Sequence, residues 1–101
     1  RGHVDIRQYY PKAGWVEHDP IEIYDSLLEA AVQALRSAGA SAREVRCIGL
    51  DNQGETIVFW DKQSGDPVYP AIVWQDRRTA AEVDRLNRQY GPVFQNSTVL
   101  D

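Results

Sequence analysis

The sequence predicts an α/β fold, and two observations carry this prediction. A helical pattern with clear start and stop signals, from Asp19 to Gly39, leads into the short apolar run Val45–Leu50. A helix that feeds a buried strand is half of a β-α-β unit. Two more apolar runs, Thr56–Trp60 and Ala71–Trp74, are bounded by Gly, Pro, Asn and Asp, as short strands usually are.

The first element in chain order is a predicted strand at Val4–Tyr10, where apolar and polar residues alternate. The helix begins at Asp19, a good N-cap, with Pro20 suited to the first helical position and Glu22 at the capping-box position. Gly39 ends the helix, because glycine readily takes a left-handed conformation. Apolar residues at spacings of three and four form one stripe, wide enough to cover a sheet: Tyr24, Leu27, Leu28, Ala31, Val32 and Leu35.

Three strands are predicted next, in an up-down-up meander. They are Val45–Leu50, Thr56–Trp60 and Ala71–Trp74, with turns at 52–54 and 64–67. The second strand has no polar alternation, which predicts that it is covered on both faces.

A second helix is predicted from Thr79, where Glu82 completes a capping box, and Gly91-Pro92 should end it. Arg77 and Arg78 precede its N-terminus, where the helix dipole disfavours cations. Such a cation is either solvated or held by a ligand or a carboxylate. For Arg78 both interpretations stay open.

Length and composition limit the functions open to this chain. The 101 residues are enough for one domain at most, and a net charge of −4 without a basic stripe argues against nucleic acid as a partner. No apolar run approaches the roughly 18 residues of a membrane span. The chain begins with Arg1 and shows no signal-peptide pattern, so we interpret it as a piece of a longer protein. Cys47, the single cysteine, is expected to be a buried thiol. A lone buried thiol and the missing signal-peptide pattern together predict a cytoplasmic location.

Polar residues gather at two points of the predicted sheet. In the meander, the end of the first strand, the start of the second and the end of the third share one edge. Carboxylate, amide and guanidinium groups beside an indole suit a small hydroxylated ligand. The alternative is two solvated turns. The residues expected to converge are Asp51, Gln53, Glu55, Trp74, Gln75, Asp76 and Arg78.

Other common sites have no sequence signature here. His3 and His18 lack partners at metal-ligand spacing, so no metal site is predicted. Neither of the common glycine-rich phosphate-binding loops occurs.

Three segments give the chain a resemblance to the FGGY family of carbohydrate kinases, and most closely to its glycerol kinases. They are G-W-V-E-H-D-P at Gly14–Pro20, I-G-L-D-N-Q-G-E-T at Ile48–Thr56 and A-I-V-W-Q-D-R-R-T-A at Ala71–Ala80. The resemblance implies part of a ribonuclease-H-like domain of the actin and hexokinase type, with a mixed sheet and flanking helices. It also implies ATP-dependent phosphorylation of a polyol or sugar, with Mg²⁺ as the metal.

Family members are several times longer than this chain. The resemblance therefore implies that residues 1–101 are part of a single, incomplete N-terminal substrate-binding domain. The ATP-binding C-terminal domain and the catalytic base would lie outside these residues. The segment alone is then expected to be inactive.

The resemblance also implies roles for individual residues. Glu55 matches the glutamate that accepts hydrogen bonds from substrate hydroxyls, and Trp74 matches the tryptophan that packs against polyol carbons. Gln75 stands at a glycerol-kinase-like position. Asp76 and Arg78 match the W-x-D-x-R pattern that is common across the family.

Gly54 departs from the family pattern. Glycerol kinases that resemble this chain carry an arginine here, and that arginine is a hydrogen-bond donor to glycerol. A glycine opens space beside Glu55, which favours a longer polyol or a ketose as substrate. The alternative is that Gly54 eases a tight turn, and both can hold together.

Two other function classes stay open. The longer protein can be a non-catalytic sugar-binding sensor or scaffold, or this piece can be an interaction domain with polar turns. The flanking sequence discriminates them, through a phosphate-binding D-x-G-T motif and a downstream aspartate. In each case we expect the isolated chain to self-associate, because its apolar helix stripe and strand edges require covering layers.

Overall fold

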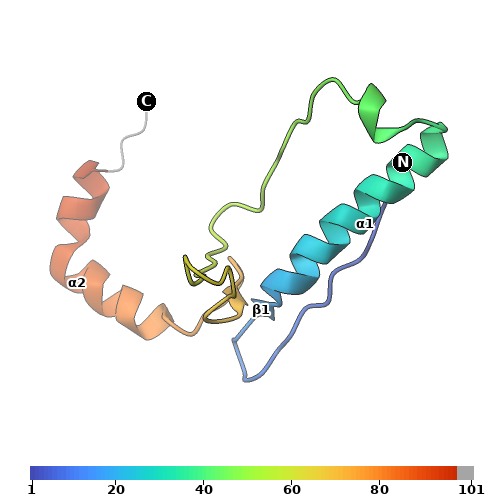
Figure 1. The fold of residues 1–101 in the computed structure, drawn as a ribbon. Helices are drawn as coiled ribbons and strands as arrows, with labels where there is room; N and C mark the ends of the chain where they lie inside the picture. Colours follow the sequence, from blue (N-terminus) through green and yellow to red (C-terminus); the bar gives the residue numbers. More distant parts are fainter. Residues whose placement is uncertain (98–101) are drawn as a thin grey trace.

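The computed structural model describes residues 1–97, in which two α-helices flank a small antiparallel sheet. Figure 1 shows α1 and α2 at opposite ends of an elongated molecule. The elements are β1 (Glu17–His18), α1 (Pro20–Ala38), a 3₁₀ helix (Ala42–Glu44), β2 (Ala71–Ile72) and α2 (Ala80–Ser97).

Helix α1 has the start and the end that its sequence predicts. The Asp19 carboxylate accepts the backbone N–H of Ile21 at 2.8 Å and of Glu22 at 3.5 Å. Gly39 closes the helix in the left-handed conformation, with φ 62°. The predicted capping box is wrong in one respect, because the Glu22 carboxylate instead accepts from the Arg7 N–H (2.8 Å) and the Tyr9 hydroxyl (3.1 Å).

The N-terminal segment runs alongside α1, as Figure 1 shows. The Ser37 hydroxyl donates to the Arg1 carbonyl at 3.2 Å, and the His3 N–H donates to the Gln33 side chain at 3.2 Å. Gly2 lies so close to the helix that a Cβ there would stand 1.8 Å from the Ala30 carbonyl oxygen. This close approach requires glycine. The predicted strand Val4–Tyr10 reduces to a single bridge, from Tyr9 to Glu17.

Four segments lie side by side at the centre. β1 pairs antiparallel with β2, and Glu17 is opposite Ile72. Isolated bridges add Tyr9 on the outer side of β1 and Ile57 on the outer side of β2. The spatial order is therefore Tyr9, Glu17, Ile72 and Ile57, with every neighbouring pair antiparallel.

The second and third predicted strands form a hairpin, as expected. Trp60 bridges Pro67, and the Asp61 carboxylate accepts the backbone N–H groups of Gln63 and Ser64 in the turn. Gly65 has φ 80°, which a glycine adopts without strain. The prediction that Thr56–Trp60 is covered on both faces is wrong for the described residues. Three of its side chains are more than half exposed: Ile57, Phe59 and Trp60.

The first predicted strand, Val45–Leu50, does not pair with another segment of residues 1–97. Ile48 is 80 % exposed and Leu50 82 % exposed. A strand needs hydrogen-bonding neighbours, and none of the described segments lies beside this one. For the same reason the prediction that Cys47 is a buried thiol is wrong, because Cys47 is exposed.

Helix α2 begins at Ala80 as predicted but does not end at Gly91-Pro92. The helix continues to Ser97, and Figure 1 shows that it changes direction along its length, as helices containing proline commonly do. The predicted capping box is also wrong, since the Glu82 carboxylate pairs with Arg85 at 2.6 and 2.9 Å.

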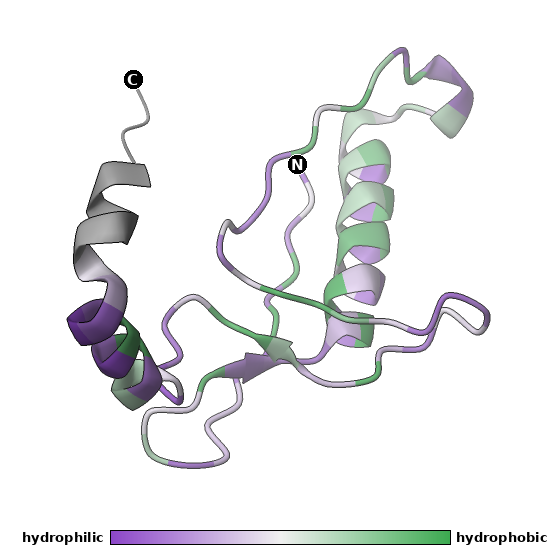
Figure 2. Cartoon of the chain, turned by 90° about the vertical axis from the view of Figure 1, so that its left-hand side faces the viewer, coloured by the Kyte–Doolittle hydropathy of each residue, from purple (hydrophilic) through white to green (hydrophobic). Residues whose placement is uncertain are grey.

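The buried centre is small. Val16, Ala71 and Val73 are its buried apolar residues, and Glu17 and His18 are buried beside them. The apolar stripe of α1 is largely exposed, and Figure 2 shows hydrophobic residues along this helix. The radius of gyration is 18.7 Å, against about 13 Å for a compact domain of this length. Neither α-helix within residues 1–97 has an apolar stretch long enough to cross a bilayer.

Candidate functional site

The register of the hairpin strand and β2 directs part of each of the two predicted polar clusters towards the same end of the sheet. Ile57 and Ile72 exchange both backbone hydrogen bonds, each 3.2 Å long. In an antiparallel pair, residues before one partner lie beside residues after the other. Glu55 precedes Ile57 by two positions and Trp74 follows Ile72 by two, so both lie at this end. Asp51 belongs to the unpaired segment, so this pairing does not bring it to the cluster.

Glu55 has an unusual backbone conformation. Its φ is +63°, the one positive value outside glycine among the described residues. For a residue with a side chain, this left-handed conformation costs roughly 1–2 kcal/mol. Strain of this kind concentrates at functional positions, where it fixes the direction of a side chain. Glu55 is exposed and lies in a turn with Gly54, where a positive φ is more often taken by glycine or asparagine.

Gly54 does not take a conformation that demands glycine. Its φ lies outside the positive range that Gly14, Gly39 and Gly65 occupy. A Cβ at position 54 would meet no atom within 4 Å. In the adjacent turn, the Gln53 amide donates to the Thr56 hydroxyl at 2.5 Å. Space is therefore open beside Glu55, and nothing in the described residues fills it.

Trp74 and Gln75 form the corner of a tight turn after β2. The Asp76 N–H donates to the Val73 carbonyl at 2.8 Å and closes this turn. Trp74 is 57 % exposed, so the residue is open to solvent. The Gln75 side chain accepts a hydrogen bond from the Gln8 amide at 2.9 Å. The turn thus presents one aromatic ring and one amide.

Asp76 and Arg78 are bound to each other. The guanidinium donates from Nε to Asp76 Oδ1 at 2.9 Å and from Nη2 to Oδ2 at 2.8 Å, in a two-pronged ion pair. Its Nη2 also donates to Glu17 Oε1 at 2.7 Å. The side chains are 11 % exposed for Arg78, 3 % for Asp76 and 11 % for Glu17. Of the two interpretations of Arg78, the second holds within the described residues: carboxylates bind this cation.

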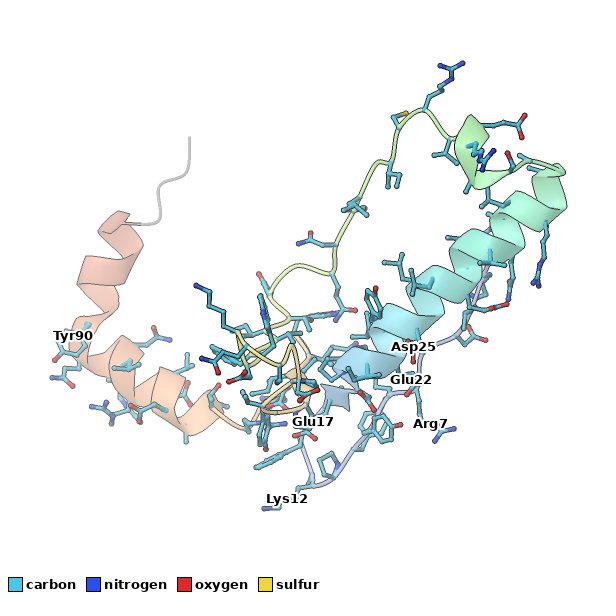
Figure 3. The ribbon with its side chains drawn as sticks, viewed as in Figure 1. Arg7, Lys12, Glu17, Glu22, Asp25 and Tyr90 are labelled. Atoms are coloured by element: carbon cyan, nitrogen blue, oxygen red, sulfur yellow. The ribbon has the colours of Figure 1, made fainter. Side chains whose placement is uncertain are left out.

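Aromatic rings complete the surroundings of Arg78. The guanidinium carbon lies 3.8 Å from the centroid of the Trp15 ring, a close cation–π contact. The Tyr69 hydroxyl accepts from Nη1 at 3.4 Å. Figure 3 labels Glu17 among the crowded side chains between the two helices. Arg77, in contrast, is exposed.

The ion pair shifts the pKa values of both partners. Hydrogen bonds from Arg78 are the largest cause that lowers the pKa of Asp76, from 3.8 to about 2. Asp76 in turn raises the pKa of Arg78 above its ordinary value, with Glu17 adding to the effect. Both groups are therefore charged at neutral pH.

Trp15, Glu17 and Tyr69 were missed as members of this cluster by the sequence interpretation. The hydrogen bond from Arg78 to Glu17 spans 61 positions of the chain, so no local pattern reveals it. The signal that was present is the segment Gly14–Pro20, which carries the family resemblance and contains both Trp15 and Glu17.

A cleft of about 690 Å³ adjoins the Arg78 cluster, because Glu17 and Tyr69, which both accept hydrogen bonds from Arg78, line it. None of the six predicted site residues itself lines the cleft. Tyr9, His18, Tyr69 and Pro70 are among the residues that line it. Within residues 1–97, no three His, Cys, Asp or Glu side chains form a group that would hold a metal ion.

Comparisons with known proteins agree with this geometry. The model of the FGGY family of carbohydrate kinases, N-terminal domain, matches residues 1–99. The chain is 52 % identical over 88 residues to a glycerol kinase of Sinorhizobium fredii, covering 87 % of the chain and 18 % of that protein. It is 49 % identical over 100 residues to a glycerol kinase of Bordetella pertussis, covering 98 % of the chain and 20 % of that protein.

A solved structure is also similar to this chain. It is the crystal structure of Plasmodium falciparum glycerol kinase with ADP, with a TM-score of 0.78 and 36 % identity over 86 % of this chain and 18 % of that one. The likeness confirms the predicted α/β class and the ribonuclease-H-like fold of the actin and hexokinase type. The chain spans about a fifth of the length of these relatives. On this evidence the chain belongs to the FGGY family of carbohydrate kinases and matches the family's N-terminal domain.

Proposed function

We propose that this chain is an incomplete part of the N-terminal substrate-binding domain of a cytoplasmic, ATP-dependent kinase. The intact protein would phosphorylate a hydroxyl of a polyol or sugar. Family membership supports the reaction class. One observation supports the assignment of the site: the register of the Ile57–Ile72 pair, which extends to Glu55 on one side and to Trp74 on the other.

The proposed site binds its substrate through Gly54, Glu55, Trp74 and Gln75, with Asp76 and Arg78 completing it. Glu55 accepts hydrogen bonds from substrate hydroxyls, and the indole of Trp74 packs against the carbon chain. Phosphoryl transfer depends mostly on holding the reacting hydroxyl in line, so such positioning is what this domain contributes. A charge-assisted hydrogen bond from a hydroxyl to Glu55 contributes roughly 1.5–3 kcal/mol.

The open space at Gly54 favours a substrate larger than glycerol. A Cβ there meets nothing within 4 Å, so extra carbons and hydroxyls have room beside Glu55. A longer polyol or a ketose fits this space better than a three-carbon substrate does.

ATP and Mg²⁺ are the cofactors that the family implies, but residues 1–97 do not fit either group. The sequence has no glycine-rich phosphate-binding loop, and the described residues offer no group of three metal-binding side chains. We therefore place both cofactors on other parts of the intact kinase and assign no step through them to this chain.

Exposed apolar surface supports the proposal that the domain is incomplete. Ile48 and Leu50 are more than three-quarters exposed, and the stripe of α1 is open along much of its length. Surfaces of this kind pack against further layers in a complete domain. In the isolated chain they favour self-association.

The test is a substrate screen with the full-length protein that contains this chain. Polyols and ketoses of three to six carbons are incubated with Mg-ATP, and phosphate esters are detected by mass spectrometry. We expect phosphorylation of at least one of them, with Trp74→Ala raising its KM. Binding of a sugar without turnover would instead indicate a non-catalytic member of the family. The absence of both binding and turnover would contradict the proposal.

A further inference from the structure

The turn that carries Trp74 and Gln75 is fixed at both ends to one residue of the neighbouring segment. The Val73 N–H donates to the Val16 carbonyl at 3.1 Å. The Val16 N–H donates to Asp76 Oδ2 at 2.6 Å. Both backbone groups of Val16 are therefore occupied by the two residues that bracket the turn.

The Asp76 carboxylate replaces a backbone carbonyl that a longer β2 would supply. β2 ends at Ile72, and the chain turns away from β1 at Trp74. The Val16 N–H would then face no carbonyl, and a buried N–H without an acceptor costs free energy. The Asp76 carboxylate supplies the missing acceptor, so the ladder between the two segments continues through a side chain.

Arg78 and Glu17 hold the carboxylate in this position. Asp76 Oδ1 also accepts the backbone N–H of Arg78 at 2.8 Å. This bond adds to the two guanidinium bonds, of which one goes to each carboxylate oxygen. Arg78 is itself fixed by Glu17, at 2.7 Å, and by stacking on Trp15. Glu17 lies on β1, next to Val16, so the cluster joins the same two segments a second time.

We propose that Asp76 is a positioning residue, which Arg78 and Glu17 lock in place so that the turn presents Trp74 and Gln75 to the substrate. This inference rests on the proposed function and deepens it. Asp76 and Arg78 do not touch the substrate themselves. Their side chains are 3 % and 11 % exposed, and every nitrogen of the guanidinium already donates to a protein oxygen.

The test is a double-mutant cycle in the full-length kinase, measured as kcat/KM for its best substrate. We expect Asp76→Asn to lower kcat/KM about 10- to 100-fold in the wild-type background, mainly through KM. In the Trp74→Ala background the same substitution should lower it less than about threefold, because the contact that it positions is already removed. Arg78→Lys, which keeps the charge but not the two-pronged geometry, should lose less than Arg78→Gln.

Amide hydrogen exchange tests, without a substrate, whether Asp76 and Arg78 hold the turn in place. In Asp76→Asn and in Arg78→Gln, the amides of Val73 and Asp76 should exchange at least about tenfold faster, while those within α1 stay unchanged. If Asp76→Asn does not fold, Arg78→Lys and Glu17→Gln test the same cluster more gently.

Three outcomes decide between the claims. An equal loss of kcat/KM in both backgrounds would show that Asp76 acts independently of Trp74 and would overturn the inference. Unchanged exchange at Val73 and Asp76 would overturn it as well. A wild-type protein that phosphorylates no polyol or ketose would contradict the proposed function instead, and the exchange experiment would still show whether the cluster holds the turn.

Discussion

Ile57 and Ile72 donate to and accept from each other's backbone at 3.2 Å, and this antiparallel pair determines the geometry of the candidate site. Continuing its register by two residues leads to Glu55 on one strand and Trp74 on the other. Glu55 has a positive φ, so the regular ladder ends where the proposed substrate contacts begin. By this register we expect the Glu55 carboxylate and the Trp74 indole at the same end of the sheet, and both residues are exposed.

The first prediction concerns Glu55. Glu55→Ala in the full-length kinase should lower kcat/KM by at least about a hundredfold, because it removes a charge-assisted hydrogen bond to a substrate hydroxyl, worth roughly 2–3 kcal/mol. Steady-state kinetics on the best substrate measure the effect. Glu55→Gln keeps the size of the side chain and should lose less.

A matched control is Glu29→Ala, which removes an exposed carboxylate on α1, far from the sheet edge. Its kcat/KM should stay within about twofold of wild type, as for most surface substitutions. Near-normal turnover by Glu55→Ala would refute the assignment of this residue.

The second prediction is a pH dependence of stability that comes from Asp76. The pKa of Asp76 is lowered from 3.8 to about 2 in the folded chain. Its ionised form therefore stabilises the fold above about pH 4, and this contribution is lost as the pH falls through about 2. Between pH 5 and pH 2, the advantage of wild type over Asp76→Asn in the free energy of unfolding should shrink by about 1–2 kcal/mol.

Urea denaturation at several pH values measures this difference. Glu82→Gln is the control, because Arg85 lowers the pKa of Glu82 too but both side chains are more than half exposed. Exposed ion pairs contribute little, so this variant should show a smaller change. A wild-type advantage over Asp76→Asn that stays constant from pH 5 to pH 2 would be inconsistent with a stabilising ion pair.

Local signals in the sequence were sufficient for some of these elements. Asp19, Pro20 and Gly39 determine where α1 starts and ends through contacts with their immediate neighbours, and α1 has the predicted bounds. The hairpin turn near Gly65 is local in the same way. The pairing of Thr56–Trp60 with Ala71–Trp74 follows from adjacent short strands joined by one turn. The structure contains this pairing, at Ile57 and Ile72, and the placement of Glu55 beside Trp74 stays a prediction.

Features that depend on distant partners were not predictable. Arg78 needs Glu17, 61 positions away, and the sequence pattern gave no means of choosing a carboxylate over solvent or a ligand. Val45–Leu50 has the composition of a strand, but composition says nothing about whether a neighbouring strand is present. The exposure of Cys47 follows from that same unpaired segment. The helix-ending signal at Gly91-Pro92 does not end the helix, and α2 continues to Ser97.

The third prediction is that the 101-residue chain alone does not bind Mg-ATP with micromolar affinity. Its sequence has no phosphate-binding loop, and residues 1–97 have no cluster of metal-binding side chains. Isothermal titration calorimetry measures this, with the full-length kinase as the positive control. A micromolar dissociation constant for the isolated chain would place a nucleotide site within these residues.

The fourth prediction is that the isolated chain self-associates. Val45–Leu50 offers an unpaired edge with two highly exposed apolar side chains, Ile48 and Leu50. Light scattering should show a mass that rises with concentration. Leu50→Lys should reduce this association, because a charge on a strand edge disfavours pairing, whereas Asn52→Lys adds the same charge at a polar site and should have less effect. A monomer at every concentration would contradict the prediction.

The last prediction concerns the choice of substrate by position 54. Gly54 has no positive φ, and a Cβ there meets no atom within 4 Å, so the backbone accepts an arginine without strain. The resemblance to glycerol kinases implies an arginine at this position in those proteins, as a donor to a substrate hydroxyl. Gly54→Arg should therefore increase kcat/KM for glycerol by roughly tenfold or more, the scale of one charge-assisted hydrogen bond of about 1.5–3 kcal/mol. It should also lower kcat/KM for the best longer substrate, because the side chain occupies the space that extra carbons need.

Gly54→Ala separates the two explanations for the glycine. If Gly54 served only to ease the turn, then alanine would destabilise the fold and leave the ratio of the two kcat/KM values unchanged. If position 54 selects the substrate, alanine should be tolerated, because its Cβ has room, and only arginine should shift the ratio towards glycerol. Kinetics on both substrates and thermal unfolding of all three proteins decide between them. A wild-type enzyme that already prefers glycerol, with a ratio that Gly54→Arg does not change, would show that position 54 has no part in selection.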